Sequence, residues 1–387
     1  MNRPAPAPEP AHKAAVLIGR FQPFHRGHGQ LLEHALALAD RVVVVIGSAH
    51  QARTAKNPWS WSERAELIRL ALPEAQRERV LFLPVRDYYN NARWTQAVRS
   101  GVAACLADAG VAVDEAQGGI ALVGHFKDAS SQYLAQFPGW VLHPVARSID
   151  IDATAIRASY FDAAQVAPGV CRTDHPAFAA RLQAALAACA DTLHDSTREF
   201  LRAWTHRPDY TRLAAEWEML REYQLSWSGA PWPPVFVTVD VLVRCDDAVL
   251  LVQRGQAPGQ GLWALPGGFI DPRETTWQSA LRELREETGL ERSIDDWRAA
   301  HRGQAVFDHP DRSLRGRTIT HAFYFDLGAG PRPLVEGADD AALARWMPVA
   351  SLPALEAHFL DDHFHMLDHF LGLTPPDDAR ILTAVGG

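Results

Sequence analysis

The chain has 387 residues, of which 47% are hydrophobic, and a formal net charge of −8. This length predicts two or three domains, and the negative charge argues against a protein that follows a nucleic-acid backbone. The four cysteines are scattered without metal or redox spacing, and no apolar run reaches the roughly 18 residues of a membrane span. We therefore expect a cytoplasmic protein with reduced thiols. The composition leaves open whether it forms a homo-oligomer.

The first part of the chain predicts a Rossmann-like α/β domain. Residues 1–12 are rich in Pro and Ala, and we expect a disordered tail there. An apolar run over 14–19 is followed by a loop, a helical pattern and a second apolar run over 41–47. Strand, loop, helix and strand form a parallel βαβ unit, so the loop lies at the carboxyl end of the first strand, where open α/β sheets bind ligands.

That loop has the features of a phosphate site. Gly27 lets the backbone approach a ligand, the start of the next helix offers free N–H groups, and His25 and His28 add imidazole donors. The stretch resembles the (H/T)XGH signature of the nucleotidyltransferase superfamily. Its longer form resembles nicotinamide mononucleotide (NMN) adenylyltransferases of the archaeal type. The resemblance implies that ATP and NMN are positioned by the whole loop, including Gly19, Arg20, Phe21, His25 and His28.

Later stretches resemble the same family and imply further substrate contacts. These are Lys56, Asn57 and Trp59 after the second strand, Asp87, Asn91 and Trp94 further on, and Lys127. Lys56 would add positive charge near phosphate, and Trp94 could stack on a pyridinium ring. A solvated lysine at Lys56 or Lys127, and a core aromatic at Trp94, are the alternative interpretations.

Residues Ile151 to Arg157 resemble the second superfamily signature, ISSTXXR, with Asp152 and Ala153 in place of the two serines. The resemblance implies that Arg157 holds triphosphate oxygens. We expect Thr154 to cap the helix that follows. A carboxylate at Asp152 would be unfavourable beside triphosphate unless it points away or meets a metal ion.

A helical pattern and a linker separate this domain from the next. Residues 176–223 predict two or three helices, and residues 228–234 form a turn-rich linker. We therefore divide the chain into a nucleotidyltransferase domain over 13–185, a helical connector over 186–230 and a second domain over 231–387.

The second domain contains a cluster of acidic residues with helical spacing. Glu283, Glu286 and Glu287 lie at i, i+3 and i+4, where like charges on one helix face repel. A hard cation such as Mg²⁺ would neutralise them. Gly289 stands where the C-cap of the helix needs a left-handed residue.

Residues Gly268 to Leu290 match every fixed position of the Nudix box, GX5EX7REUXEEXGU. The resemblance implies an α+β Nudix fold with Mg²⁺, or Mn²⁺ in its place, on the three glutamates, and Arg282 as the partner of Glu274. A phosphate-rich substrate would meet the basic loop before residue 318, for which a solvated turn is the alternative. The implied substrate contacts are Gly267, Gly268, Arg315 and Arg317. The general base would be one of the box glutamates or a later one such as Glu336.

The order of the two domains resembles bacterial bifunctional NMN adenylyltransferase/Nudix hydrolases. This resemblance implies synthesis of NAD and pyrophosphate from ATP and NMN, and Mg²⁺-dependent hydrolysis of ADP-ribose to AMP and ribose 5-phosphate. The sequence leaves open another nucleotidyl acceptor, a Nudix site for another dinucleotide, and a Nudix domain that only senses ADP-ribose. We interpret the histidine-rich segment from His358 to His369 as an amphipathic helix rather than a metal site.

Overall fold

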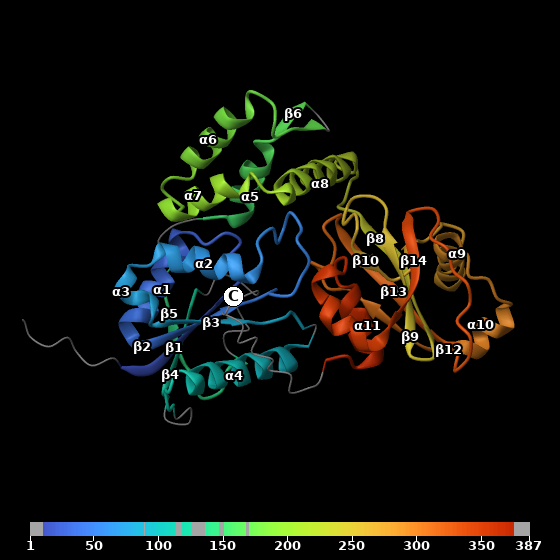
Figure 1. The fold of residues 1–387 in the computed structure, drawn as a ribbon, viewed down its shortest axis with the longest axis horizontal. Coiled ribbons are helices and arrows are strands. Elements are labelled where there is room, and N and C mark those ends of the chain that lie inside the picture. The colour runs from blue at the N-terminus through green and yellow to red at the C-terminus, as the bar shows by residue number, and fades with distance from the viewer. Residues whose placement is uncertain are drawn as a thin grey trace, which may run out of the picture.

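The computed structural model describes residues 11–88, 90–113, 118–125, 136–146, 151–167 and 170–374. Within these residues the chain forms an α/β domain, a group of helices above it and a mixed-sheet domain beside it (Figure 1). No helix in this described part of the chain combines the length and the apolar character that a bilayer crossing requires.

The first domain has the predicted parallel sheet. Its five strands run in the order β3 (Val80–Pro84), β2 (Ala39–Ile46), β1 (His12–Gly19), β4 (Ile120–Gly124) and β5 (Val141–Pro144). All four pairings are parallel, and the buried parts of the central strands, Ala14–Leu17 and Val42–Ile46, are apolar because helices cover both faces. Helices α1 (Arg26–Leu38) and α2 (Trp61–Ala71) pack on one face and α4 (Asn91–Asp108) on the other, with the short α3 (Glu74–Arg77) before β3.

The helices that follow confirm the predicted helical segment. They are α5 (Ala153–Asp162), α6 (Phe178–Ala188), α7 (Asp195–Trp204) and α8 (Pro208–Ser226), with a small hairpin of β6 (Gln165–Ala167) and β7 (Val170–Cys171) after α5. Aromatic side chains from three of them, Tyr160, Trp204 and Tyr210, fill their common core. Pro208 begins α8, where a missing N–H costs nothing.

The second domain is built on a mixed sheet with helices on both faces. The main strand order is β10 (Trp263–Ala264), β9 (Ala248–Arg254), β8 (Val235–Cys245), β13 (Arg317–Asp326) and β12 (His301–Phe307), and β11 (Gly267–Phe269) and β14 (Ala341–Pro348) pair with β8 and β9. Helices α9 (Thr276–Thr288) and α10 (Ile294–Ala300) pack on one face, and α11 (His363–Leu371) and the 3₁₀ helix Val349–His358 pack on the other.

Two local features of this domain follow from the residues at their turns, and the second confirms the C-cap predicted at Gly289. Strands β8 and β9 form an antiparallel hairpin whose turn contains Asp246 at φ 55°. Helix α9 ends at Gly289 in the left-handed conformation, with φ 66°.

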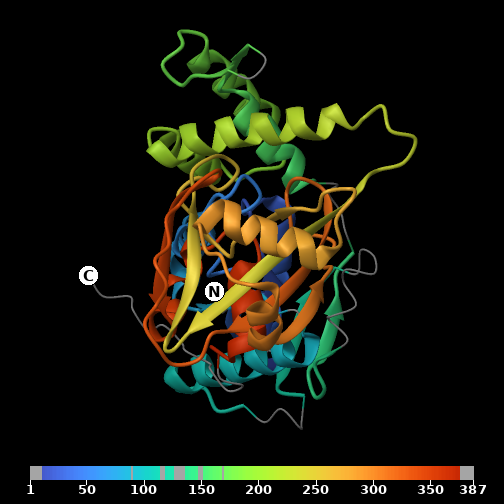
Figure 2. The ribbon, with the colours of Figure 1, turned by 90° about the vertical axis from the view of Figure 1, so that its right-hand side faces the viewer.

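Polar contacts join the two domains. Arg86 Nη2 donates to Glu356 Oε2 at 2.6 Å, and Arg93 Nη2 donates to Thr374 Oγ1 at 2.8 Å. Helix α8 extends across the top of the second domain (Figure 2), and its Gln224 donates to the carbonyl of Leu314 at 2.9 Å. The arrangement brings the loop over 308–316 to the carboxyl edge of the parallel sheet.

Candidate active sites

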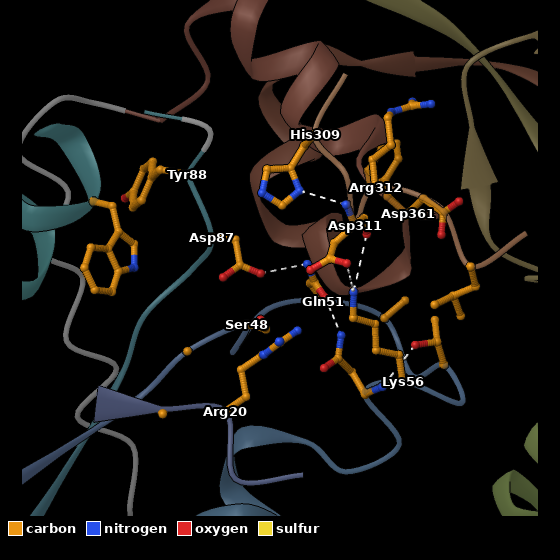
Figure 3. Close-up of a pocket in the computed structure, with 18 of the residues that line it drawn as sticks. Arg20, Ser48, Gln51, Lys56, Asp87, Tyr88, His309, Asp311, Arg312 and Asp361 are labelled. Atoms are coloured by element: carbon orange, nitrogen blue, oxygen red, sulfur yellow. Dashed lines mark hydrogen bonds and ion pairs between the residues drawn. The ribbon is translucent and has the colours of Figure 1, made fainter. Parts of the chain in front are cut away.

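A cavity of about 500 Å³ lies at the carboxyl ends of β1 and β2 (Figure 3). One wall comes from the first domain and includes predicted residues, namely Gly19, Arg20, Lys56, Asn57, Asp87, Asn91 and Trp94. The opposite wall comes from the second domain, with His309, Asp311, Arg312, Leu314, Phe359 and Asp361. We call this cavity the first pocket.

Three cations lie close together at the first pocket. Burial lowers the pKa of Lys56, and the charges of Arg20 and Arg157 lower it further. Burial, with Arg20 adding to it, lowers the pKa of Arg157 to about 10. The charge of Asp311 partly offsets the shift at Lys56, and that of Asp152 partly offsets the shift at Arg157. A cluster of three cations suits a ligand with several phosphates.

His25 and His28 form a reciprocal cap at the start of α1. The backbone N–H of each donates to Nδ1 of the other, at 3.3 and 3.4 Å, and their rings stack with centroids 3.6 Å apart. Burial, with the neighbouring His25 adding to it, holds the pKa of His28 well below its usual value. Because both Nδ1 atoms accept, each neutral ring carries its proton on Nε2 and is a donor there. Neither ring lines the first pocket.

Helix α5 corrects one prediction and explains the altered signature. Asp152, not Thr154, caps α5: its carboxylate accepts from the backbone N–H of Thr154 at 2.8 Å. Arg157 donates to the carbonyl of Gln22 at 2.6 Å and to Thr154 Oγ1 at 3.3 Å. Arg157 and Thr154 line a smaller cavity of about 190 Å³ that shares Lys56 with the first pocket. The carboxylate of Asp152 is thus hydrogen-bonded to the backbone N–H of Thr154 at the start of α5.

The structure places the predicted aromatic residues in different roles. Trp59 is 1% exposed and packs against Tyr160 and Trp204 in the helical core, so it does not line the pocket. Phe21 is equally buried and lies so close to Gly19 that a Cβ there would meet its ring at 2.8 Å. Trp94 lines the pocket and also packs edge-on against Phe137. Lys127 lies outside the described residues.

The Nudix box forms a loop and helix with its charges organised by Arg282. The predicted pair is present, with Arg282 Nε 2.9 Å from Glu274 Oε2. Nη1 of the same guanidinium donates to both Glu283 and Glu286 at 2.9 Å. Glu287 accepts from the backbone N–H of Gly267 at 2.9 Å. Gly268 lies against the Glu283 carboxylate, which would have to move to admit a Cβ there, 2.7 Å away.

The box carboxylates are oxygen donors of the kind that divalent cations bind, but they are not gathered around one point. Burial raises the pKa of Glu287 to about 8, with Glu283 contributing repulsion, and burial also raises the pKa of Glu283. Within the described ranges, no three His, Cys, Asp or Glu side chains are grouped so that they could hold a metal ion. Arg282 binds Glu283 and Glu286, so a cation would have to take these two carboxylates from the guanidinium.

A second pocket lies beside Glu287. It includes the predicted Gly267, Gly268 and Arg315, and Arg312 of the basic loop expected to meet phosphate, together with residues that the sequence did not suggest, namely Asp240, Arg254, Asp361 and His363. Arg317 and Glu336 are not part of this lining.

Polar residues in and next to the second pocket form a buried network. Arg312 binds Asp362 through two hydrogen bonds of 2.7 and 2.9 Å, and His363 Nδ1 accepts from the backbone N–H of Leu265 at 2.9 Å. Asp240 accepts from Thr320 Oγ1 at 2.5 Å. A carboxylate inside the apolar run of β8 was the one sequence signal for this network.

Comparisons with known proteins divide the chain in the same way. Residues 16–159 match the cytidylyltransferase-like family, and residues 234–370 match the NUDIX domain family. The chain is 34% identical to a nicotinamide/nicotinic acid mononucleotide adenylyltransferase of Acinetobacter baylyi, over 38% of this chain and 74% of that protein. It is 34% identical to an ADP-ribose pyrophosphatase of Methanocaldococcus jannaschii, over 31% of this chain but only 65% of that protein.

Two solved structures match both domains together. A bifunctional NMN adenylyltransferase/ADP ribose pyrophosphatase from Francisella tularensis is 34% identical, with a TM-score of 0.80 over 93% of this chain and 99% of that one. A second structure from the same organism, complexed with AMP and a manganese ion, is 32% identical with a TM-score of 0.79 over the same shares.

Proposed function

This chain belongs to the family of bifunctional NMN adenylyltransferase/ADP-ribose pyrophosphatase proteins, and from that premise we propose that it carries out both reactions. The first pocket would join ATP and NMN to give NAD and pyrophosphate. The second would hydrolyse ADP-ribose to AMP and ribose 5-phosphate. The observation that carries the proposal is that one chain holds two pockets, which share Arg312 and Asp361 and are each lined by arginine or lysine side chains suited to phosphate.

In the first pocket the chain acts by positioning. The NMN phosphate attacks the α-phosphate of ATP in line, which needs no covalent nucleophile. Arg20, Lys56 and Arg157 offset the charge that develops on the phosphate oxygens. The Nε2–H groups of His25 and His28, at the start of α1 and outside the lining of the first pocket, are the donors that would meet a phosphate placed at that helix end.

In the second pocket Glu283, Glu286 and Glu287 would hold Mg²⁺. A bound divalent ion activates water and offsets the charge of the pyrophosphate. Arg315 and Arg254 face the same space and hold the phosphates of the substrate. Glu287 lines the pocket and Glu336 does not, which favours Glu287 over Glu336 as the general base.

The proposal is tested by incubating the protein with Mg²⁺, ATP and NMN, and separately with ADP-ribose, while products are followed by chromatography. NAD and pyrophosphate should form in the first incubation, and AMP and ribose 5-phosphate in the second. Absence of either product set would refute that half of the proposal. A third incubation with NADH tests the alternative that the second pocket acts on another dinucleotide; hydrolysis of NADH in place of ADP-ribose would favour that alternative.

Two variants assign the reactions to the two sites. Glu287→Gln should abolish ADP-ribose hydrolysis and leave NAD synthesis intact. Arg157→Ala should lower kcat of NAD synthesis more than it raises KM for NMN, and leave hydrolysis intact. Each variant is the folding control for the other, and loss of both reactions in either one would contradict the separation of the sites.

A further inference from the structure

The loop over 308–316, between β12 and β13, reaches out of the Nudix domain into the first pocket (Figure 3). Its residues His309, Asp311, Arg312 and Leu314 line that pocket. The adenylyltransferase site is therefore completed by the other domain.

The main charge contact between the loop and the first domain is made by Asp311. Nζ of Lys56 lies 3.5 Å from the Asp311 carboxylate and 3.5 Å from its carbonyl oxygen. Lys56 is the more buried partner, with 24% of its side chain exposed against 62% for Asp311. The carboxylate is thus a solvent-facing counter-ion placed on a cation of the phosphate site.

The rest of the loop is firmly anchored. The next residue, Arg312, forms its two hydrogen bonds with Asp362 where the two side chains are only 5% and 2% exposed. Gln224 of α8 holds the carbonyl of Leu314. The Asp311 side chain can therefore turn away from Lys56 while the backbone of the loop stays in place.

We propose that Asp311 is a positioning residue of the adenylyltransferase site, supplied by the Nudix domain, which holds Lys56 in the empty pocket and competes with a substrate phosphate for it. The inference rests on the function proposed for the first pocket. An incoming phosphate must take Lys56 from a carboxylate that is already there. Asp311 therefore raises the KM of the substrate whose phosphate Lys56 binds, and acts only through Lys56.

The test is a steady-state comparison of Asp311→Asn with the wild-type chain at low ionic strength, varying ATP and NMN in turn. Exposed ion pairs typically contribute a factor of about two to five to an equilibrium constant. We therefore expect KM for one substrate to fall about two- to fivefold, with kcat changed less than about twofold. The fall should shrink in about 0.5 M salt, which screens exposed charges.

Two matched variants isolate the contact. Asp308→Asn makes the same charge change in the same loop, outside the pocket lining, and should leave both KM values unaltered. In a Lys56→Gln background, Asp311→Asn should have no further effect on KM. An equal fall in KM with Asp308→Asn or in the Lys56→Gln background would overturn the proposal.

The remaining outcomes separate the inference from the function it rests on. If the wild-type chain forms no NAD, the proposed function of the first pocket fails. If NAD forms and Asp311→Asn leaves KM unchanged, the competition does not exist. If KM rises, the carboxylate contacts the substrate itself or holds the domains together, and the proposal is wrong. The thermal unfolding midpoint of the variant accompanies each measurement to show that it is folded.

Discussion

At the scale of single residues, Glu287 shows how the second site depends on a cation. Its side chain is 5% exposed and accepts one backbone hydrogen bond, and burial raises its pKa to about 8. Without a divalent ion the folded chain therefore binds a proton at Glu287 that the unfolded chain releases above its ordinary pKa of 4.5. The fold thus holds the carboxylate in a place that favours either a proton or a metal ion.

We predict that this carboxylate makes the metal-free chain less stable as pH rises. Between pH 4.5 and about 8 the folded state binds more protons at Glu287 than the unfolded state, so the free energy of unfolding falls, by at most about 1.4 kcal/mol per pH unit. Glu287→Gln removes this dependence. In EDTA, the thermal unfolding midpoint of wild type should fall relative to that of the variant as the pH rises from 5 to 8.

The difference between the two chains isolates Glu287 from its neighbours. Burial raises the pKa of Asp361 to about 6, which acts in the same direction, and lowers the pKa of His363 to about 3, which acts in the opposite one below pH 6.5. Both groups are present in both chains. Saturating Mg²⁺ should remove the part of the wild-type pH dependence that is due to Glu287. An identical gap between variant and wild type at pH 5 and pH 8 in EDTA would contradict the prediction.

At the scale of one element, α5 shows how a departure from a family signature is accommodated. Of the signature residues in this helix, Asp152 caps its N-terminus and Arg157 lines the smaller cavity next to the first pocket. Asp152 caps the first turn, and Arg157, one turn later, reaches the carbonyl of Gln22 in the loop before α1. A carboxylate that accepts a backbone N–H satisfies an otherwise unpaired donor and interacts favourably with the helix dipole.

We predict that Asp152→Ala lowers the free energy of unfolding by about 1 kcal/mol, the usual cost of losing a cap. Asp152→Ser should recover most of it, because a serine hydroxyl can accept the same bond from Thr154. Chemical denaturation with urea measures both. Equal stability of the alanine and serine variants would show that the side chain at 152 does not act as a cap.

At the scale of the whole molecule, the two domains are joined through ion pairs and hydrogen bonds near the first pocket. Arg86 and Glu356 form the shortest of these contacts, with 17% and 10% of their side chains exposed. Burial raises the pKa of Glu356 to about 7, which Arg86 partly offsets. The pair fixes the wall that the Nudix domain contributes to the first pocket.

We predict that Glu356→Ala weakens the junction more than it weakens either domain. The guanidinium of Arg86 loses its carboxylate partner, which costs about 1.5–3 kcal/mol for a hydrogen bond between charged groups. Calorimetry should then resolve two unfolding transitions in place of a shared one. Asp295→Ala, which removes an ion pair exposed on the surface, is the control and should leave the profile unchanged. A single unaltered transition in Glu356→Ala would contradict a structural role for the pair.

The sequence by itself determined the order of the domains, the βαβ unit and the acidic helix face. These follow from local spacing: buried parallel strands are apolar throughout, and glutamates at i, i+3 and i+4 share one face of any helix. The pairing of Arg282 with Glu274, which the resemblance to the Nudix box implied, is present at 2.9 Å. Such features depend on residues that are neighbours in the chain.

Only the tertiary structure decided which side chains meet from distant elements. It placed Trp59 in the helical core, gave the cap of α5 to Asp152, and added Asp240 and His363 to the second pocket. It also brought Asp311 to Lys56 across 255 residues of sequence. Burial and charge pairing of this kind depend on how helices and sheets from distant parts of the chain pack together. The periodicity within one segment does not show which other segment it will contact.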